Sequence, residues 1–157
     1  MQEADLAELL VLQRCCWVQE AIANDTLQIA ALHETAADLA AWAATWRVWC
    51  VRRNGRLVAA VRAHADEPSW EIGRLMVAPD LAGNGVGRWL LDYAENQAPP
   101  GVTRFVLSTG RFSDRNIALY QRAGYTIETD QRAAAGSVQL TRPRPRTRGI
   151  NQQGGNQ

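Results

Sequence analysis

The sequence predicts an α/β fold in which a mixed, mostly antiparallel central sheet is flanked by helices on both faces. Three observations favour this class. Apolar residues recur at helical spacing near the N-terminus, Asn54-Gly55 is a strong β-hairpin signal, and three glycines stand between a predicted strand and a predicted helix at residues 83–87. We expect one domain over residues 1–141 and a disordered tail over 142–157, because the tail is rich in Arg, Pro, Gly, Gln and Asn.

Two helices are predicted first. The apolar spacing indicates a helix over residues 4–22, which the turn-forming run Asn24-Asp25-Thr26 ends. The second helix begins at Thr35, whose side chain is suited to cap it, and runs to about Thr45.

The remaining elements alternate between strands and helices. Strands are predicted over residues 47–53 and 57–63, joined by the hairpin turn, and over residues 70–78, ended by Pro79. A helix over residues 85–97 is stopped by Pro99. The last predicted elements are a strand at 103–108, a helix at 114–122 capped by Gly124, and strands at 125–129 and 137–141.

Bulk properties exclude several classes of protein. The chain has 157 residues, with 17 basic and 16 acidic side chains and a net charge of +1. This balance argues against nucleic acid or a membrane surface as the main partner. No apolar run approaches the roughly 18 residues of a membrane span, and the acidic start is not a signal peptide. We therefore expect a cytoplasmic protein.

Cysteine and histidine give no metal-site pattern. Cys15 and Cys16 are adjacent, Cys50 is distant, and His33 and His64 are far apart. Neither a CxxC pair nor any other zinc-ligand spacing is present, so we expect no metal and reduced thiols.

The glycine turn is the segment that points to chemistry. Its residues are Gly83, Asn84, Gly85, Val86, Gly87 and Arg88. Glycines allow positive φ and leave room for a ligand, while the N–H groups of the turn and the helix dipole favour an anion such as pyrophosphate. A tight strand-to-helix connection with no ligand is the alternative explanation.

Neighbouring motifs extend this turn into a family resemblance. The strand Glu71-Ile72-Gly73-Arg74-Leu75-Met76-Val77-Ala78-Pro79 precedes it, and Ser113-Asp114-Arg115-Asn116-Ile117-Ala118-Leu119-Tyr120 and Gly124-Tyr125 follow it. Together they resemble the GNAT superfamily (Gcn5-related N-acetyltransferases) from about residue 70 to 125. Two features depart from the family pattern. Ala82 stands where the turn usually opens with Gln or Arg, and no strand is predicted before the first helix.

The resemblance implies an acetyl-CoA site. In such proteins the fourth strand and the next one splay apart around the pantetheine arm, which here would place Leu75, Met76 and Val77 against it. A bulge there would aim a backbone N–H of Met76 or Val77 at the thioester oxygen. The resemblance also implies that Asn116 contacts pantetheine and that Tyr120 protonates the departing thiolate. The residues expected at the pyrophosphate are Ala82, Gly83, Asn84, Gly85, Val86, Gly87 and Arg88.

The reaction needs a base, because an amine is mostly protonated at neutral pH. Glu71 is the candidate, because it precedes the expected cofactor-binding residues on the same strand. Regular alternation would place Glu71 with Gly73 and Leu75 on one face of the strand. A solvent-facing carboxylate without a catalytic role is an equally good interpretation of Glu71.

The acceptor side is expected to involve the first two helices, with Trp17 and Glu20 as candidate substrate-binding residues. Four of the six tryptophans lie between Trp17 and Trp49. They would form an aromatic-walled pocket for a cationic amine or simply pack the helices against the sheet.

The resulting hypothesis is an N-acetyltransferase that uses acetyl-CoA and acts by direct attack in a ternary complex. The acceptor is expected to be a small-molecule amine or a protein N-terminal amine. The sequence is also compatible with a homodimer formed through exposed sheet edges. The main alternative is a non-catalytic acyl-CoA sensor of the same fold. A third hypothesis is a nucleic-acid-associated function, such as acetylation of an aminoacylated tRNA. It rests on the Arg-rich tail, and the net charge of +1 does not favour it.

Overall fold

The structure is a computed structural model that describes residues 2–128 and 136–145. Within these residues the chain forms five α-helices and six strands. The helices are α1 (Leu6–Ala23), α2 (Ala30–His33), α3 (Ala36–Ala43), α4 (Val86–Asn96) and α5 (Asp114–Arg122). The strands are β1 (Arg47–Arg53), β2 (Arg56–Asp66), β3 (Ser69–Val77), β4 (Arg104–Gly110), β5 (Thr126–Ile127) and β6 (Ser137–Pro143).

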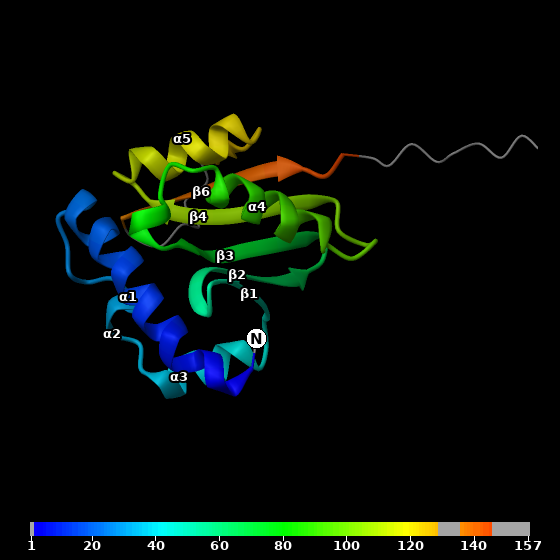
Figure 1. The fold of residues 1–157 in the computed structure, drawn as a ribbon. Coiled ribbons are helices and arrows are strands. Elements are labelled where there is room, and N and C mark those ends of the chain that lie inside the picture. The colour runs from blue at the N-terminus through cyan, green and yellow to red at the C-terminus, as the bar shows by residue number, and fades with distance from the viewer. Residues whose placement is uncertain (1, 129–135, 146–157) are drawn as a thin grey trace, which may run out of the picture.

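The strands form one sheet in the order β1-β2-β3-β4-β6-β5 (Figure 1). Every neighbouring pair is antiparallel except β3 and β4, which are parallel. Asn54 and Gly55 both have positive φ, 51° and 81°, and make the predicted hairpin turn between β1 and β2. The mixed, mostly antiparallel sheet predicted from the sequence is therefore confirmed.

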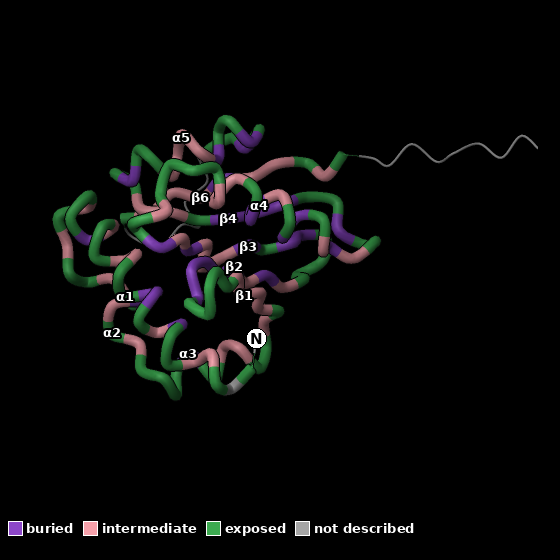
Figure 2. The backbone as a smooth tube through the Cα atoms, in the orientation of Figure 1, coloured by how far each residue is buried: buried purple, intermediate pink, exposed green. Residues whose placement is uncertain are grey.

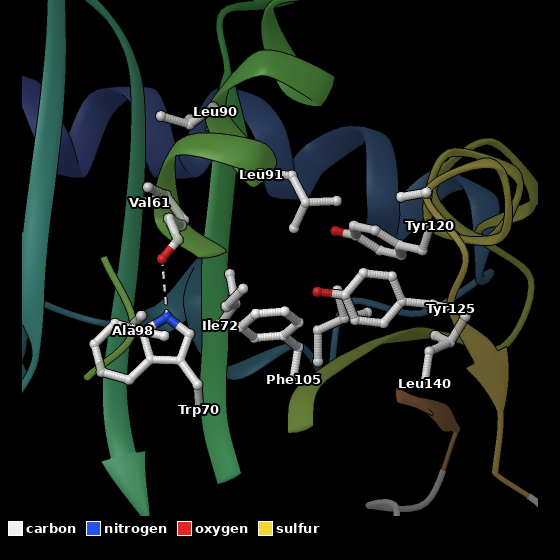
Figure 3. Close-up of a cluster of buried hydrophobic side chains, with 14 of the residues drawn as sticks. Val61, Trp70, Ile72, Leu90, Leu91, Ala98, Phe105, Tyr120, Tyr125 and Leu140 are labelled. Atoms are coloured by element: carbon white, nitrogen blue, oxygen red, sulfur yellow. Dashed lines mark hydrogen bonds between the residues drawn. The ribbon is translucent and has the colours of Figure 1, made fainter. Parts of the chain in front are cut away.

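Helices α4 and α5 cover one face of the sheet and form the larger core with it (Figure 1). Leu90 and Leu91 of α4 are fully buried against apolar side chains of β2 and β3. The Trp70 indole, 1% exposed, donates a hydrogen bond of 2.9 Å to the Ala94 carbonyl, which ties β3 to α4 (Figure 3). On this side the sheet and its helices are one packed unit.

Helices α1 and α3 lie against the opposite face, where they form a second core. Leu9 and Leu39 are fully buried there and pack with Ala60 of β2 and Met76 of β3. Figure 2 shows buried segments on both sides of the sheet. The helices on both faces are thus present as predicted.

Most element boundaries agree with the sequence predictions. Thr35 caps α3 as expected, in a reciprocal capping box with Asp38. The short helix α2 was not predicted, because four residues are too few to show helical periodicity. The predicted strand at residues 125–129 is only Thr126–Ile127 in the structure, and its last residue lies outside the described residues.

The chain beyond Thr141, which was predicted to be a tail, begins with residues that continue the last strand and pack on the domain. Strand β6 continues to Pro143, and the Arg142 guanidinium pairs with the buried Glu95 carboxylate and donates a 2.6 Å hydrogen bond to the Ala123 carbonyl. Glu95 also accepts a 2.8 Å hydrogen bond from the Tyr125 hydroxyl. An Arg- and Pro-rich segment predicts a solvated tail, but the Arg142 guanidinium here offsets the charge of a carboxylate that α4 buries.

The Arg144 side chain is also engaged, with hydrogen bonds to three carbonyls between α4 and β4. The predicted tail therefore contributes residues 142–145 to the domain. Residues 146–157 lie outside the described residues, so the predicted disorder there stays a prediction.

We expect the substitution Arg142→Met to lower the free energy of unfolding by about 3 kcal/mol, because it leaves Glu95 buried without a cation. Methionine keeps an apolar contact with the rings of Phe105 and Tyr125 that Arg142 covers. The measurement is urea unfolding followed by circular dichroism. The control, Arg53→Met at the exposed end of β1, should change stability by less than about 0.5 kcal/mol. Equal stability of both variants would show that Arg142 is not part of the core.

Candidate active site

Strands β3 and β4 separate part-way along their length, and this opens the site. Their parallel pairing is confined to Ser69–Glu71 on β3 and Arg104–Val106 on β4. At the same point the β2–β3 register shifts between the Arg62–Gly73 and Ala60–Met76 pairs. One residue of β2, Val61, therefore lies opposite two residues of β3, Arg74 and Leu75. Arg74 has a φ of 50°, which is uncommon for a residue with a side chain. A β-bulge at Arg74 therefore accompanies the splay that the family resemblance implied.

The bulge reverses the order in which side chains alternate along β3. Before it, Trp70 and Ile72 pack on the α4 side. After it, Leu75 and Val77 also pack on the α4 side, whereas Met76 is buried on the α1 side. The prediction that Leu75 shares a face with Glu71 and Gly73 is therefore wrong, because the bulge inserts one extra residue.

A cleft of about 840 Å³ occupies the gap between the splayed strands. Its walls are α1, the second half of β3, the glycine turn, the end of β4, and α5. The predicted site residues that line it are Trp17, Glu20, Leu75, Val77, Ala82, Gly83, Gly85, Gly87, Arg88, Asn116 and Tyr120. The predicted residues outside the lining are Glu71, Met76, Asn84 and Val86.

The glycine turn closes one end of the cleft. Gly83 and Gly85 have φ of 86° and 79°, and Gly85 is the N-cap of α4. A side chain at Gly85 would meet nothing within 4 Å, so positive φ rather than crowding requires glycine there. The uncapped first N–H groups of α4 are therefore available to an anion.

Three arginines line the cleft near this turn. Arg88 is held by Asp92, at 3.0 Å, and donates a 3.3 Å hydrogen bond to the Arg122 carbonyl at the end of α5. The exposed side chains of Arg115 and Arg122 also line the cleft, and Arg115 reaches to about 4.0 Å from the position of a Cβ on Gly83. This end of the cleft is positively charged and open, as an anionic ligand requires.

Asn116 lies in a hydrogen-bond network that joins α5 to α1. Its amide donates to Glu20 Oε1 at 2.8 Å and to Thr109 Oγ1 at 3.4 Å. The buried Ser113 hydroxyl donates to the other Glu20 oxygen and accepts a 2.9 Å hydrogen bond from Asn24. Glu20 is thus a bridge across the cleft as well as part of its wall, a role that the sequence did not indicate.

Tyr120 lines the cleft but is almost entirely buried. Only 7% of the residue is exposed, and its ring lies 6.2 Å from that of Tyr125. In Figure 3 its hydroxyl points inward, toward Leu91. Burial and, secondarily, the Glu20 carboxylate raise the pKa of Tyr120 well above the usual range. The phenol therefore keeps its proton at neutral pH, and no described residue forms a hydrogen bond with its hydroxyl.

Comparison with known proteins identifies the family. The sequence profile of the acetyltransferase (GNAT) family matches residues 8–125. The chain belongs to this family. The GNAT pattern expected from the motifs around the glycine turn is thereby confirmed.

A curated relative of this GNAT chain is an IAA acetyltransferase from Azospirillum brasilense, which is 32% identical over 82 residues. That match covers 50% of this chain and 54% of the relative, so it spans about half of that protein's length.

Solved structures show the same fold. The PaiA N-acetyltransferase from Thermoplasma acidophilum, in complex with coenzyme A, has a TM-score of 0.73 at 12% identity, with 92% of this chain and 96% of that chain covered. The ribosomal-protein-alanine N-acetyltransferase from Brucella melitensis has a TM-score of 0.68 at 20% identity, covering 91% and 96%.

The α1 side of the GNAT cleft combines aromatic and charged groups. The Arg74 guanidinium lies over the Trp17 ring, 4.9 Å from its centroid, and forms an ion pair with Glu34. Gln13 holds the other Glu34 oxygen at 2.8 Å. Arg74 was not predicted to be part of the site, although its position directly before Leu75 in the motif could have indicated it.

Cys16 also lies in the cleft, although no cysteine falls within the GNAT motifs. Its thiol donates to the Val77 carbonyl at 3.3 Å. Burial raises the pKa of Cys16 to about 11, so the group is a thiol and not a thiolate at neutral pH.

Glu71 is the predicted site residue that the structure leaves apart from the others. Its side chain is 48% exposed, and the His64 Nε2 lies 3.9 Å from Glu71 Oε2. Glu71 points to the same face as Gly73, a cleft residue two positions along the strand. Because Glu71 does not line the cleft, its side chain would not directly contact a ligand bound there.

No helix among residues 2–128 and 136–145 is long and apolar enough to cross a membrane. In the same residues no three His, Cys, Asp or Glu side chains are grouped as a metal ion would need.

Proposed function

We propose that this GNAT chain is an N-acetyltransferase that moves an acetyl group from acetyl-CoA to a primary amine. The observation that carries the proposal is the coincidence of three features in one cleft. They are the β4-facing edge of β3, which is not paired with β4 beyond Glu71, the positive glycine turn, and the Tyr120 hydroxyl, which has no hydrogen-bond partner among the described residues.

The residues present fit acetyl-CoA. The N–H groups from Gly83 to Arg88 suit its pyrophosphate, because two glycines with positive φ leave the turn open on the cleft side. The Ala82 N–H already donates to the Pro79 carbonyl, so Ala82 would line the site without donating to the phosphate. The edge of β3 at Leu75, Met76 and Val77 is not paired with β4 and suits the pantetheine amides, which can pair with a strand edge. The Val77 carbonyl accepts a hydrogen bond from the Cys16 thiol. Although the Met76 side chain is buried away from the cleft, its backbone lies in this edge. The absence of a Gln or Arg at Ala82 leaves this backbone cradle intact.

Bound acetyl-CoA supplies an acetyl thioester. In this proposal a backbone N–H of Met76 or Val77 stabilises the negative charge on the thioester oxygen as the amine attacks. Tyr120 donates its phenolic proton to the departing sulfur. Because the pKa of Tyr120 is raised, the phenol still holds this proton at neutral pH. Asn116 is held in place by Glu20 and Thr109 to contact the pantetheine arm.

Direct attack in a ternary complex is favoured over an acyl-cysteine route. Cys16 is the cysteine that lines the cleft, and its buried thiol is a poor nucleophile. Accumulation of acetylated Cys16 during incubation with acetyl-CoA alone would contradict direct attack.

The comparisons support the amine as the acceptor. Two structural neighbours are N-acetyltransferases, and one of them acts on a ribosomal-protein alanine according to its name. The curated relative is an IAA acetyltransferase. A small-molecule amine and a protein N-terminal amine are the two acceptor classes that we propose, with Trp17 and Glu20 at the acceptor end of the cleft.

Acetyl-CoA is expected to raise the melting temperature of the protein and to release free coenzyme A in the presence of a suitable primary amine. The measurement combines a thermal-shift assay with a thiol-release assay over a panel of amines. Stabilisation without thiol release for any amine would favour the sensor alternative. Absence of stabilisation would contradict an acetyl-CoA site altogether.

The substitution Tyr120→Phe should lower kcat by about 10²-fold to 10⁴-fold while leaving acetyl-CoA binding unchanged, because it removes the proton donor and keeps the buried ring. Thermal shift reports the binding, and thiol release reports kcat. The control is Tyr93→Phe on the outer part of α4, where 37% of the tyrosine is exposed. Similar kcat values for both variants would exclude Tyr120 as the general acid.

We propose Glu71 as the base that deprotonates the amine through bridging water, since Gly73 lies about 7 Å further along the strand on the same face. The substitution Glu71→Gln should then lower kcat/KM by about tenfold or more, with a changed pH profile. Asp66→Asn, in the same β2–β3 hairpin, is the control. Wild-type turnover by Glu71→Gln from about pH 6 to about pH 9 would remove Glu71 from the mechanism.

A further inference from the structure

Arg62 is a partly buried cation for which no described residue provides a hydrogen-bond acceptor. It projects from β2, and its Cζ lies 4.6 Å from the centroid of the Trp42 ring and 4.1 Å from that of Trp46. Its Nε is buried without a partner, and no described residue accepts a hydrogen bond from its terminal nitrogens, which keep some contact with solvent. Two indole rings therefore hold the guanidinium in place but satisfy none of its N–H groups.

The carboxylates nearest to Arg62 are engaged elsewhere. Glu34 pairs with Arg74 through one oxygen and accepts a hydrogen bond from Gln13 through the other. Glu71 is half exposed and faces His64. Burial and the charge of Arg74 lower the pKa of Arg62 to about 10, so Arg62 still carries its charge at neutral pH.

Arg62 stands directly behind the bulge that opens the cleft. It pairs across the sheet with Gly73, which lines the cleft. A Cβ on Gly73 would lie 3.4 Å from Arg62 Nε and 3.6 Å from Cζ3 of Trp46. Any side chain at position 73 would thus crowd Arg62 and Trp46. Arg62 is not itself one of the residues that line the cleft, and the glycine is what keeps the space between it and the cleft free of a side chain.

An unpaired guanidinium at this depth is costly, because it loses hydration and gains no acceptor in exchange. A ligand carboxylate would supply the missing acceptor, and arginine binds a carboxylate through two parallel hydrogen bonds. The flanking indoles preorganise the guanidinium plane, which reduces the entropy lost on binding.

We propose that Arg62 anchors the acceptor, and that the acceptor is a small primary amine that also carries a carboxylate, such as an amino acid. This inference rests on the proposed acetyl transfer and names its substrate class. The carboxylate would lie at Arg62 behind Gly73, and the amine would extend past Arg74 and Trp17 toward the splayed end of β3.

The test compares matched amines in the thiol-release assay with acetyl-CoA. The probes are glycine, L-phenylalanine and 4-aminobutyrate, each with its carboxamide. For at least one pair, wild-type kcat/KM should favour the acid by about tenfold to about hundredfold, the factor expected of a charge-assisted hydrogen bond. Arg62→Met should reduce this preference to less than about threefold and change the amide rate little, whereas the exposed-site control Arg53→Met should keep the preference.

Two results would overturn the proposal. One is a wild-type enzyme that acetylates the amides as well as the acids. The other is an Arg62→Met enzyme that loses activity equally toward acid and amide, which would make Arg62 a packing residue between Trp42 and Trp46. Arg62→Lys, which keeps the charge but not the paired hydrogen bonds, should retain an intermediate preference, and circular dichroism of each variant checks its fold.

A binding measurement separates this proposal from the proposed function. Because it lacks an amine, 3-phenylpropionate tests the carboxylate site without any transfer. It should raise the melting temperature of the wild-type protein and of Arg53→Met, but not that of Arg62→Met, and its carboxamide should have no effect. Failure of acetyl-CoA to bind would end the proposed function, whereas failure of 3-phenylpropionate to stabilise the protein would end the carboxylate site alone.

Discussion

The end of pairing between β3 and β4 is the constraint on which the rest of the site depends. Parallel strands normally continue side by side, but here the ladder stops at Glu71 and Val106 and β3 turns away through the bulge at Arg74. A strand edge inside a protein must find other partners for its N–H and C=O groups. An amide-bearing ligand such as the pantetheine arm proposed above would meet that requirement, which further apolar packing would not.

The two cores make this opening stable. On one face α4 and α5 pack on Trp70 and Ile72, and on the other face α1 and α3 pack on Met76. The bulge lets a single strand contribute to both cores on either side of the gap. The strain of a positive φ at Arg74 is thus held by packing on both faces, a pattern common at functional sites.

Local signals made much of this fold predictable. Asn54-Gly55 fixed the hairpin, Thr35 fixed a helix start, and the glycines at 83–87 marked the turn before α4, because each acts through the backbone of its own neighbours. The surrounding motifs also predicted a set of site residues, and most of these line one cleft in the structure.

What could not be predicted depends on contacts between distant segments. The hydrogen bond of Asn116 with Glu20 spans 96 positions, and the pair of Arg142 with Glu95 spans 47. Regular alternation misplaced Leu75, because one inserted residue changes every later side chain in a strand. The partly buried position of Arg62 between two indoles likewise follows from the packing of α3 on β2, which residue type alone does not reveal.

The bridge through Glu20 has a consequence for how the two ends of the cleft communicate. Glu20 and Trp17 are on the same helix, and Glu20 holds Ser113 and Asn116 at the start of α5. A ligand that displaces α1 at one end must therefore strain or release the hydrogen bonds that position α5 at the other. Thermodynamic linkage makes such an effect reciprocal, so the two substrates of this cleft would sense each other's affinity through a single carboxylate.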